Sequence, residues 1–226
     1  MGKMTGQDDG NGSGGPGSRR RLNREERLEE IRAVAQAQAL SSGLQQLTHR
    51  SIAAELGVTH ALVVHYEPDI ESLRARTCEA LLMGEFDEVV GTLNGDADPV
   101  SNLSRVIGLM SRPGREDFAG VWLDGWSLGR RDAAAARAVR AMMDRWQGLV
   151  ANMLSRGTGA GVFADVDPQE CAWEIIALLD GLSAHTLVGY GDPQHYSARV
   201  AAPVEARLGL ARGTLNATLA PVHGPH

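Results

Sequence analysis

The stretch from Thr48 to Leu73, THRSIAAELGVTHALVVHYEPDIESL, constrains the fold most tightly, because it predicts two short helices joined by a tight turn. Thr48 and Thr59 suit the first positions of these helices, since a hydroxyl can accept a hydrogen bond from a first-turn amide. Gly57 falls where the chain must reverse, and Pro68 ends the second helix by disfavouring helical geometry before it. Two short helices with a glycine-containing turn form a helix-turn-helix, whose second helix can enter a DNA major groove.

The same stretch resembles the DNA-binding signature of the TetR family of bacterial transcriptional regulators. The resemblance covers about residues 24–76, and a weaker likeness extends over residues 116–190. The residues that carry it are Thr48, the run from Ile52 to Thr59, His65, Tyr66, Pro68 and Leu73. The alternative is a helical hairpin inside an unrelated all-α protein. The resemblance implies an all-α fold with an N-terminal three-helix DNA-binding unit and a C-terminal helical domain for ligand binding and dimerisation.

Three positions depart from the family pattern. Val64 replaces the usual aromatic near the end of the recognition helix, Glu67 replaces a Phe or Val, and Ile70 replaces a Lys. In the family, the aromatic and the Lys commonly contact the phosphate backbone. A carboxylate at Glu67 would be repelled if it faced phosphate. These departures put the affinity for DNA and the type of operator in question.

Composition favours helices and gives no sign of an oxidising compartment. Aromatic residues make up 4% of the chain, and Ala, Leu, Arg and Glu are abundant, which suits helices better than sheets. The two cysteines, Cys78 and Cys171, are too far apart in sequence for a CxxC motif and do not suggest a disulfide scaffold. The first 18 residues are polar and rich in Gly, and no apolar run reaches the length of a membrane span. We therefore expect a soluble, cytoplasmic protein.

The formal net charge of −6 is unevenly distributed along the chain. Residues 19–76 contain nine Arg against eight acidic residues, whereas residues 77–226 contain 12 Arg against 18 acidic residues. The N-terminal segment is therefore relatively basic, but charge alone would not have indicated DNA binding.

Four segments follow from the pattern of helices and breaks. Residues 1–18 contain seven Gly and are expected to be a disordered tail. Residues 19–76 form the expected DNA-binding domain, which opens with Arg19–Arg21, either a basic arm that reaches DNA or a solvated charge run. Residues 77–212 form the expected ligand-binding and dimerisation domain, and residues 213–226 look like a mobile tail. We expect helices over about 23–40, 69–93, 100–110, 116–128, 132–156 and from 168, and a last one from Asp192-Pro193 that Pro203 kinks or divides.

Candidate DNA contacts follow from the helix-turn-helix. Residues near the start of its second helix reach base edges, where His60 can donate or accept a hydrogen bond and Ala61 and Leu62 offer apolar contact. Phosphate contacts are expected from Thr48, Arg50, Thr59, His65 and Tyr66, and the alternative for His65 and Tyr66 is intradomain packing.

Candidate ligand contacts come from the aromatic residues of the second half, where all four Trp lie. By family resemblance, an apolar cavity there would hold an inducer. The proposed lining is Phe118, Trp122, Trp126, Met142, Trp146, Cys171 and His185, with Trp173 as a further candidate. The alternative is that aromatic and Met residues at helical spacing are ordinary core. No cofactor is expected, and His60 and His65 are poorly spaced to share a metal.

The function that these observations favour is a ligand-responsive transcriptional repressor. It would form a homodimer through its last two helices, about residues 168–209. The homodimer would bind a palindromic operator. The main alternative is a dimeric regulator with weakened DNA binding that acts through a protein partner. An enzyme is disfavoured, because the sequence holds no nucleophile-elbow motif, paired metal-ligand spacing or dinucleotide loop.

Overall fold

The computed structural model describes residues 23–93, 95 and 98–215, and every regular element within them is helical. The expected tails and the Arg19–Arg21 arm fall wholly or largely outside these residues, so their interpretation stays a prediction. The elements in chain order are α1 Arg24–Ser42, η1 Leu44–Gln46, α2 His49–Leu56, α3 His60–Tyr66, α4 Ile70–Gly91, α5 Pro99–Met110, α6 Glu116–Gly129, α7 Ala133–Gly159, α8 Pro168–Thr186, η2 Pro193–His195 and α9 Tyr196–Leu208.

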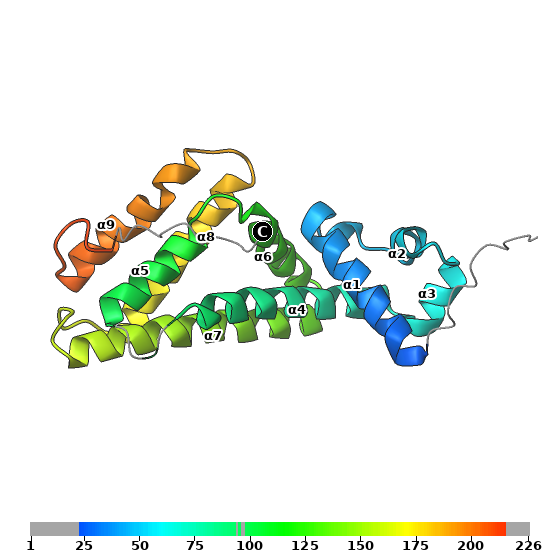
Figure 1. The fold of residues 1–226 in the computed structure, drawn as a ribbon, viewed down its shortest axis with the longest axis horizontal. Coiled ribbons are helices and arrows are strands. Elements are labelled where there is room, and N and C mark those ends of the chain that lie inside the picture. The colour runs from blue at the N-terminus through cyan, green and yellow to red at the C-terminus, as the bar shows by residue number, and fades with distance from the viewer. Residues whose placement is uncertain (1–22, 94, 96–97, 216–226) are drawn as a thin grey trace, which may run out of the picture.

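The molecule is elongated, with α1, α2 and α3 gathered at one end and α5, α8 and α9 at the other (Figure 1). The helices α4 and α7 run side by side along the length between them, and α6 lies at the middle of the molecule, packed against α1, α4, α7 and α8. One continuous set of buried apolar side chains extends through both ends, from Ile31 in α1 to Leu208 in α9. The end that carries α3 is therefore joined to the opposite end through packed helices.

Local capping interactions fix most helix starts close to where the sequence predicts them. Asn23 accepts a hydrogen bond from the Glu26 N–H while the Glu26 carboxylate accepts one from the Asn23 N–H, which fixes the start of α1. Asp69 caps α4 through the Glu71 N–H at 3.0 Å, and Asp167 caps α8 with Pro168 in its first position.

The end of α7 differs from the sequence prediction. The helix continues past Arg156 and ends at Gly159, so Gly157 lies inside it. A Cβ at Gly157 would lie 2.1 Å from a ring carbon of Phe163, which is itself buried. Gly157 is therefore needed because the ring of Phe163 folds back onto α7, and the glycine does not mark the end of the helix.

The last helix and the segment after it also differ from expectation. Asp192 and Pro193 lead into the short turn η2, and α9 begins only at Tyr196 and continues through Pro203 without dividing. The buried Glu205 carboxylate accepts hydrogen bonds from the Gly213 and Leu215 N–H groups at 2.8 and 2.7 Å. The expectation of a mobile tail from Gly213 is therefore wrong for its first three residues, because these two bonds and the burial of Leu215 hold them in place.

Across the described ranges, no helix has the length and apolar character needed to cross a membrane.

Candidate DNA-binding and effector-binding sites

The helix-turn-helix forms as its sequence predicts. The Thr48 hydroxyl accepts a hydrogen bond from the Ser51 N–H at 2.9 Å, and the Thr59 hydroxyl accepts one from the Leu62 N–H at 3.3 Å. Gly57 adopts the left-handed conformation, with φ 61° and ψ 40°, that the turn between α2 and α3 requires. The buried side chains Ile52 and Val63 anchor the two helices to the core, so α3 is held at a defined angle.

The side of α3 that faces away from this core remains accessible. Among the predicted DNA contacts, six side chains are exposed and two, Leu62 and Tyr66, are half-buried. The exposed six are Thr48, Arg50, Thr59, His60, Ala61 and His65. The ring of His65 packs edge-on against that of Tyr66, with ring centroids 5.2 Å apart. Exposure leaves these residues available to a duplex, and their contact with DNA stays a prediction.

Two residues that sequence reasoning missed lie beside this surface. The His49 ring meets the His60 ring edge-on, with centroids 5.8 Å apart, and its Nε2 lies 2.7 Å from the Glu67 carbonyl oxygen. His49 therefore connects the start of α2 to both ends of α3. At the N-terminus of α1, the Arg24 guanidinium lies over the Tyr66 ring, 5.8 Å from its centroid. Neither contact has a local sequence signal, because each joins separate helices.

The three residues that depart from the family pattern lie in different environments. The Glu67 side chain is only 8% exposed and forms an ion pair with Arg76 on α4, so it does not present an unpaired carboxylate to phosphate. Val64 is half-buried, and Ile70 is half-buried with its side chain packed on the core. The condition under which Glu67 would repel phosphate is therefore not met in this geometry. Glu67 therefore no longer supports the alternative of a regulator with weakened DNA binding, which the three departures had suggested.

In the other half of the molecule, a small hollow lies between α4, α6 and α8. Trp122 and Trp126 of α6 line it with ring centroids 5.8 Å apart and planes tilted by 41°. Glu85 of α4 lies against Trp122, whose indole Nε1 donates a hydrogen bond to its carboxylate at 2.8 Å. Arg115 donates to the other oxygen of Glu85 at 2.6 Å, and both charged side chains are buried. The Glu85 carboxylate is thus fully engaged by protein groups.

Asp180 of α8 lines the same hollow. Unlike that of Glu85, its carboxylate has no hydrogen-bond donor or ion-pair partner within the part of the chain that the structure describes. Burial, together with the nearby charge of Glu85, raises the pKa of Asp180 to about 6. Above that pH, the hollow combines two indole rings with one unpaired negative charge. That combination is complementary to a small organic cation.

The helix that carries both indoles also contacts the DNA-binding end. The Asp124 carboxylate, on α6 between Trp122 and Trp126, accepts a hydrogen bond from the Leu44 N–H at 2.6 Å. Leu44 begins η1, one residue beyond the end of α1, and is completely buried. This hydrogen bond connects α6 to the turn between α1 and α2.

Comparison with known proteins identifies the architecture. Residues 99–209 match the family model described as the C-terminal domain of BetI-type transcriptional repressors. A transcriptional regulator from Saccharomonospora viridis, solved in complex with choline, is similar at 26% identity and a TM-score of 0.72. That similarity covers 78% of this chain and 94% of that one. The chain belongs to the TetR family of transcriptional regulators.

Other TetR-type structures share the fold at lower identity. A regulator from Rhodococcus sp. is 17% identical with a TM-score of 0.67, over 81% of this chain and 99% of that one. A regulator from Haloarcula marismortui is 18% identical with a TM-score of 0.68, over 82% of this chain and 97% of that one. A search of curated proteins found no match. TetR-family regulators are transcription factors that bind DNA and small molecules, and they are not enzymes.

In this TetR-family chain, only two of the predicted effector contacts line the hollow, namely Trp122 and Trp126. Phe118 instead stacks under the Arg115 guanidinium, 4.9 Å from its ring centroid. Met142 and Trp146 belong to the packed core, and the Trp146 ring meets Phe86 edge-on. Met142 and Trp146 recur at helical spacing because α7 buries one face in the core of the protein.

The remaining candidates lie elsewhere in the regulator. Cys171 is buried among core residues, and burial raises the pKa of its thiol. His185 is exposed and packs against Tyr190 near the end of α8, and Trp173 is 59% exposed. Sequence reasoning missed Glu85, Arg115 and Asp180, because buried charges carry no periodic signal. The described residues contain no cluster of potential metal ligands.

Proposed function

We propose that this chain is a ligand-responsive repressor that binds a palindromic operator as a homodimer and is released by a small organic cation. The observation that carries the proposal is the unpaired Asp180 carboxylate beside the two indoles of Trp122 and Trp126. A quaternary ammonium has no hydrogen to donate, so aromatic faces and one carboxylate are the groups that stabilise it best. The similar regulator from Saccharomonospora viridis was solved in complex with choline, which is an ion of this kind.

The small volume of the hollow supports a role in releasing DNA, because a bound cation would have to change the conformation. As it stands, the hollow admits about 20 Å³, close to one water molecule. A larger cation therefore requires the exposed Leu123 and the half-buried Trp126 to move outward with α6. Movement of α6 changes the position of Asp124 relative to Leu44, and with it the support of α1 and α2. The cation would thus favour a conformation in which α3 no longer fits its half-site.

The proposed dimer uses the outer face of α8. Ile176 and Leu179 of α8 are 7% and 2% exposed and belong to the core of the same chain, so they are not available to a partner. The outer face carries Trp173, Ala177 and Gly181, which recur every fourth residue and are all exposed. An exposed face with small residues beside one large indole is suited to self-association about a two-fold axis. A two-fold dimer would present two copies of α3 to a palindrome.

The experiment uses the full chain and DNA from its own upstream region in a mobility-shift assay at low salt. We expect a retarded complex that millimolar choline dissociates. The Asp180→Asn variant should retard the DNA equally and resist choline, whereas Asp144→Asn, a change at an exposed site on α7, should behave as the parent. A complex that choline leaves intact in the parent would contradict the assignment of the effector, and the absence of any complex would contradict the assignment as a DNA-binding repressor.

A further inference from the structure

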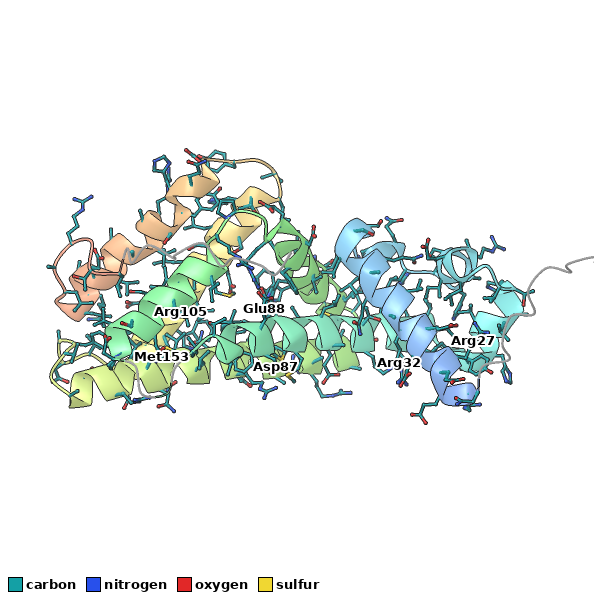
Figure 2. The ribbon with its side chains drawn as sticks, viewed as in Figure 1. Arg27, Arg32, Asp87, Glu88, Arg105 and Met153 are labelled. Atoms are coloured by element: carbon teal, nitrogen blue, oxygen red, sulfur yellow. The ribbon has the colours of Figure 1, made fainter. Side chains whose placement is uncertain are left out.

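A second and larger hollow lies between α4, α5 and α7, and it shares no lining residue with the Trp122 hollow. Its volume is about 440 Å³, within the range of sites for small organic molecules. The apolar part of its lining comes from Phe86 of α4 and from Leu149 and Met153 of α7. Met153 lies where α5 crosses α7 (Figure 2).

One stripe of α7 forms a wall of this second hollow. Arg145, Leu149, Asn152 and Arg156 recur every three or four residues and so lie on one face of the helix. The stripe extends about 16 Å, at 1.5 Å of rise per residue. Gly148 lies within it, and a Cβ added there would meet no atom within 4 Å. The glycine therefore leaves open space in the wall of the hollow.

The polar groups of this hollow are cationic or neutral. The Arg145 guanidinium lies over the Phe86 ring, 5.0 Å from its centroid. The Arg156 guanidinium donates one hydrogen bond, to the Gly95 carbonyl oxygen at 3.0 Å. Across residues 23–93, 95 and 98–215, neither arginine forms an ion pair, and no Asp or Glu lines the hollow. A guanidinium has five N–H donors, so Arg156 retains capacity for a carboxylate.

We propose that this second hollow binds an amphipathic anion, namely a medium-chain carboxylate. The carboxylate head pairs with Arg156 and accepts a hydrogen bond from the Asn152 side chain, both at one end of the stripe. The hydrocarbon chain lies over Met153, Leu149 and Phe86, which supply the apolar surface. Arg145, over Phe86, closes the other end. The head and the tail of such a ligand match the two chemically distinct parts of the hollow, and a cation would be repelled from both ends.

The test is titration calorimetry of the full chain with decanoate, and with decanol as the uncharged analogue. Arg156→Gln should weaken decanoate binding about tenfold or more, the usual loss for a hydrogen-bonded charge, and should leave decanol unaffected. Gly148→Leu fills the hollow and should abolish binding of both compounds. Its matched control is Gly84→Leu, in the middle of α4, where an added Cβ also meets nothing within 4 Å. That variant should bind decanoate as the parent does.

The Trp126→Ala variant separates the two hollows, because Trp126 lines only the first. It should leave decanoate binding unchanged. The proposal is wrong if the parent binds no decanoate, if Gly148→Leu binds it normally, or if Trp126→Ala removes binding that Gly148→Leu retains. Equal binding of decanoate and decanol would contradict the role given to Arg156. Melting curves check each variant, and Gly148→Leu is expected to be at least as stable as the parent, since leucine is the better helix former.

Discussion

Asp124 and Leu44 are 80 residues apart in sequence, yet the Asp124 carboxylate accepts the Leu44 N–H at 2.6 Å. The contact is tight, because a Cβ added at the neighbouring Gly43, which has a φ of +90°, would lie 2.9 Å from the same carboxylate oxygen. Gly43 and Leu44 lie at the junction of α1 and η1, and Asp124 lies on α6 between the two indoles of the effector hollow. The two proposed sites are therefore linked through one hydrogen bond and the packing around it.

The first prediction concerns that hydrogen bond. Asp124→Ala leaves the buried Leu44 N–H without its acceptor and should cost roughly 1–3 kcal/mol of stability. We expect choline and operator DNA each to bind nearly as in the parent, while the factor by which choline weakens DNA binding falls towards one. Fluorescence anisotropy of labelled operator, with and without choline, measures this factor. Asp144→Ala is the control, and an unchanged factor in Asp124→Ala would show that the signal travels by another route.

The second prediction concerns pH and stability. The pKa of Asp180 is about 6 in the folded protein and 3.8 in its ordinary state, so the folded state holds this proton more tightly. The contribution of Asp180 to the free energy of unfolding should be greatest below pH 4 and should fall as the pH rises to about 6. Asp180→Asn removes this fall. The variant should exceed the parent by roughly 1–3 kcal/mol at pH 7.5 and by little at pH 4, in urea unfolding monitored by circular dichroism. An advantage that is equal at both pH values would contradict the buried, unpaired state of this carboxyl.

The same group predicts how effector binding depends on pH. The proposed cation site requires the ionised form of Asp180, so the affinity for choline should rise as the pH increases through about 6 and then level off. Glu85 and Arg115, the other charged residues of the hollow, form an ion pair with each other, whereas the Asp180 carboxylate is unpaired within the described residues. Calorimetric titrations at pH 5, 6 and 7.5 measure this directly. An affinity that is flat over this range would place the cation away from Asp180.

Sequence reasoning predicted the local features of this fold far better than its long-range contacts. Thr48, Gly57 and Thr59 were predicted in their roles because a cap or a tight turn depends only on the next few residues. The hydrogen bond from Trp122 to Glu85 spans 37 positions, and no spacing rule reveals it. Apolar spacing along α8 does not by itself show that Ile176 faces the core while Trp173 faces outward. Residues at three- and four-residue spacing lie on overlapping faces, and only the packing of neighbouring helices decides which face is covered.

A prediction about recognition follows from the exposure of His60 at the start of α3. His60→Ala should relax the preference for one base pair in each half-site, at a cost of roughly 1–3 kcal/mol against the preferred base. Binding to a panel of operators with single substitutions, measured by anisotropy, tests this. Arg50→Gln is the comparison, since loss of a phosphate contact weakens binding to all sequences alike. A uniform loss in His60→Ala would make His60 a backbone contact.

A prediction about assembly follows from the outer face of α8. Trp173→Arg should shift the protein towards a monomer in light scattering while leaving its melting temperature nearly unchanged in dilute solution, because this side chain is 59% exposed in the single chain. Val162→Arg, at an exposed site after α7, should leave the dimer intact. Ile176→Arg should instead unfold the chain, since it buries a charge in the core. A Trp173→Arg protein that remains dimeric would place the interface on another surface.

The most direct test of the whole account is reciprocity between the two sites. If choline and operator favour different conformations of one protein, each must weaken the other by the same factor, which for proteins of this kind is typically about 5–150. The measurement is calorimetry of choline with the free protein and with the protein saturated by operator DNA, set beside the anisotropy of the operator at both choline levels. The account predicts two equal factors well above one, and Asp180→Asn should reduce both to one. A choline affinity that is the same with and without bound operator would contradict it.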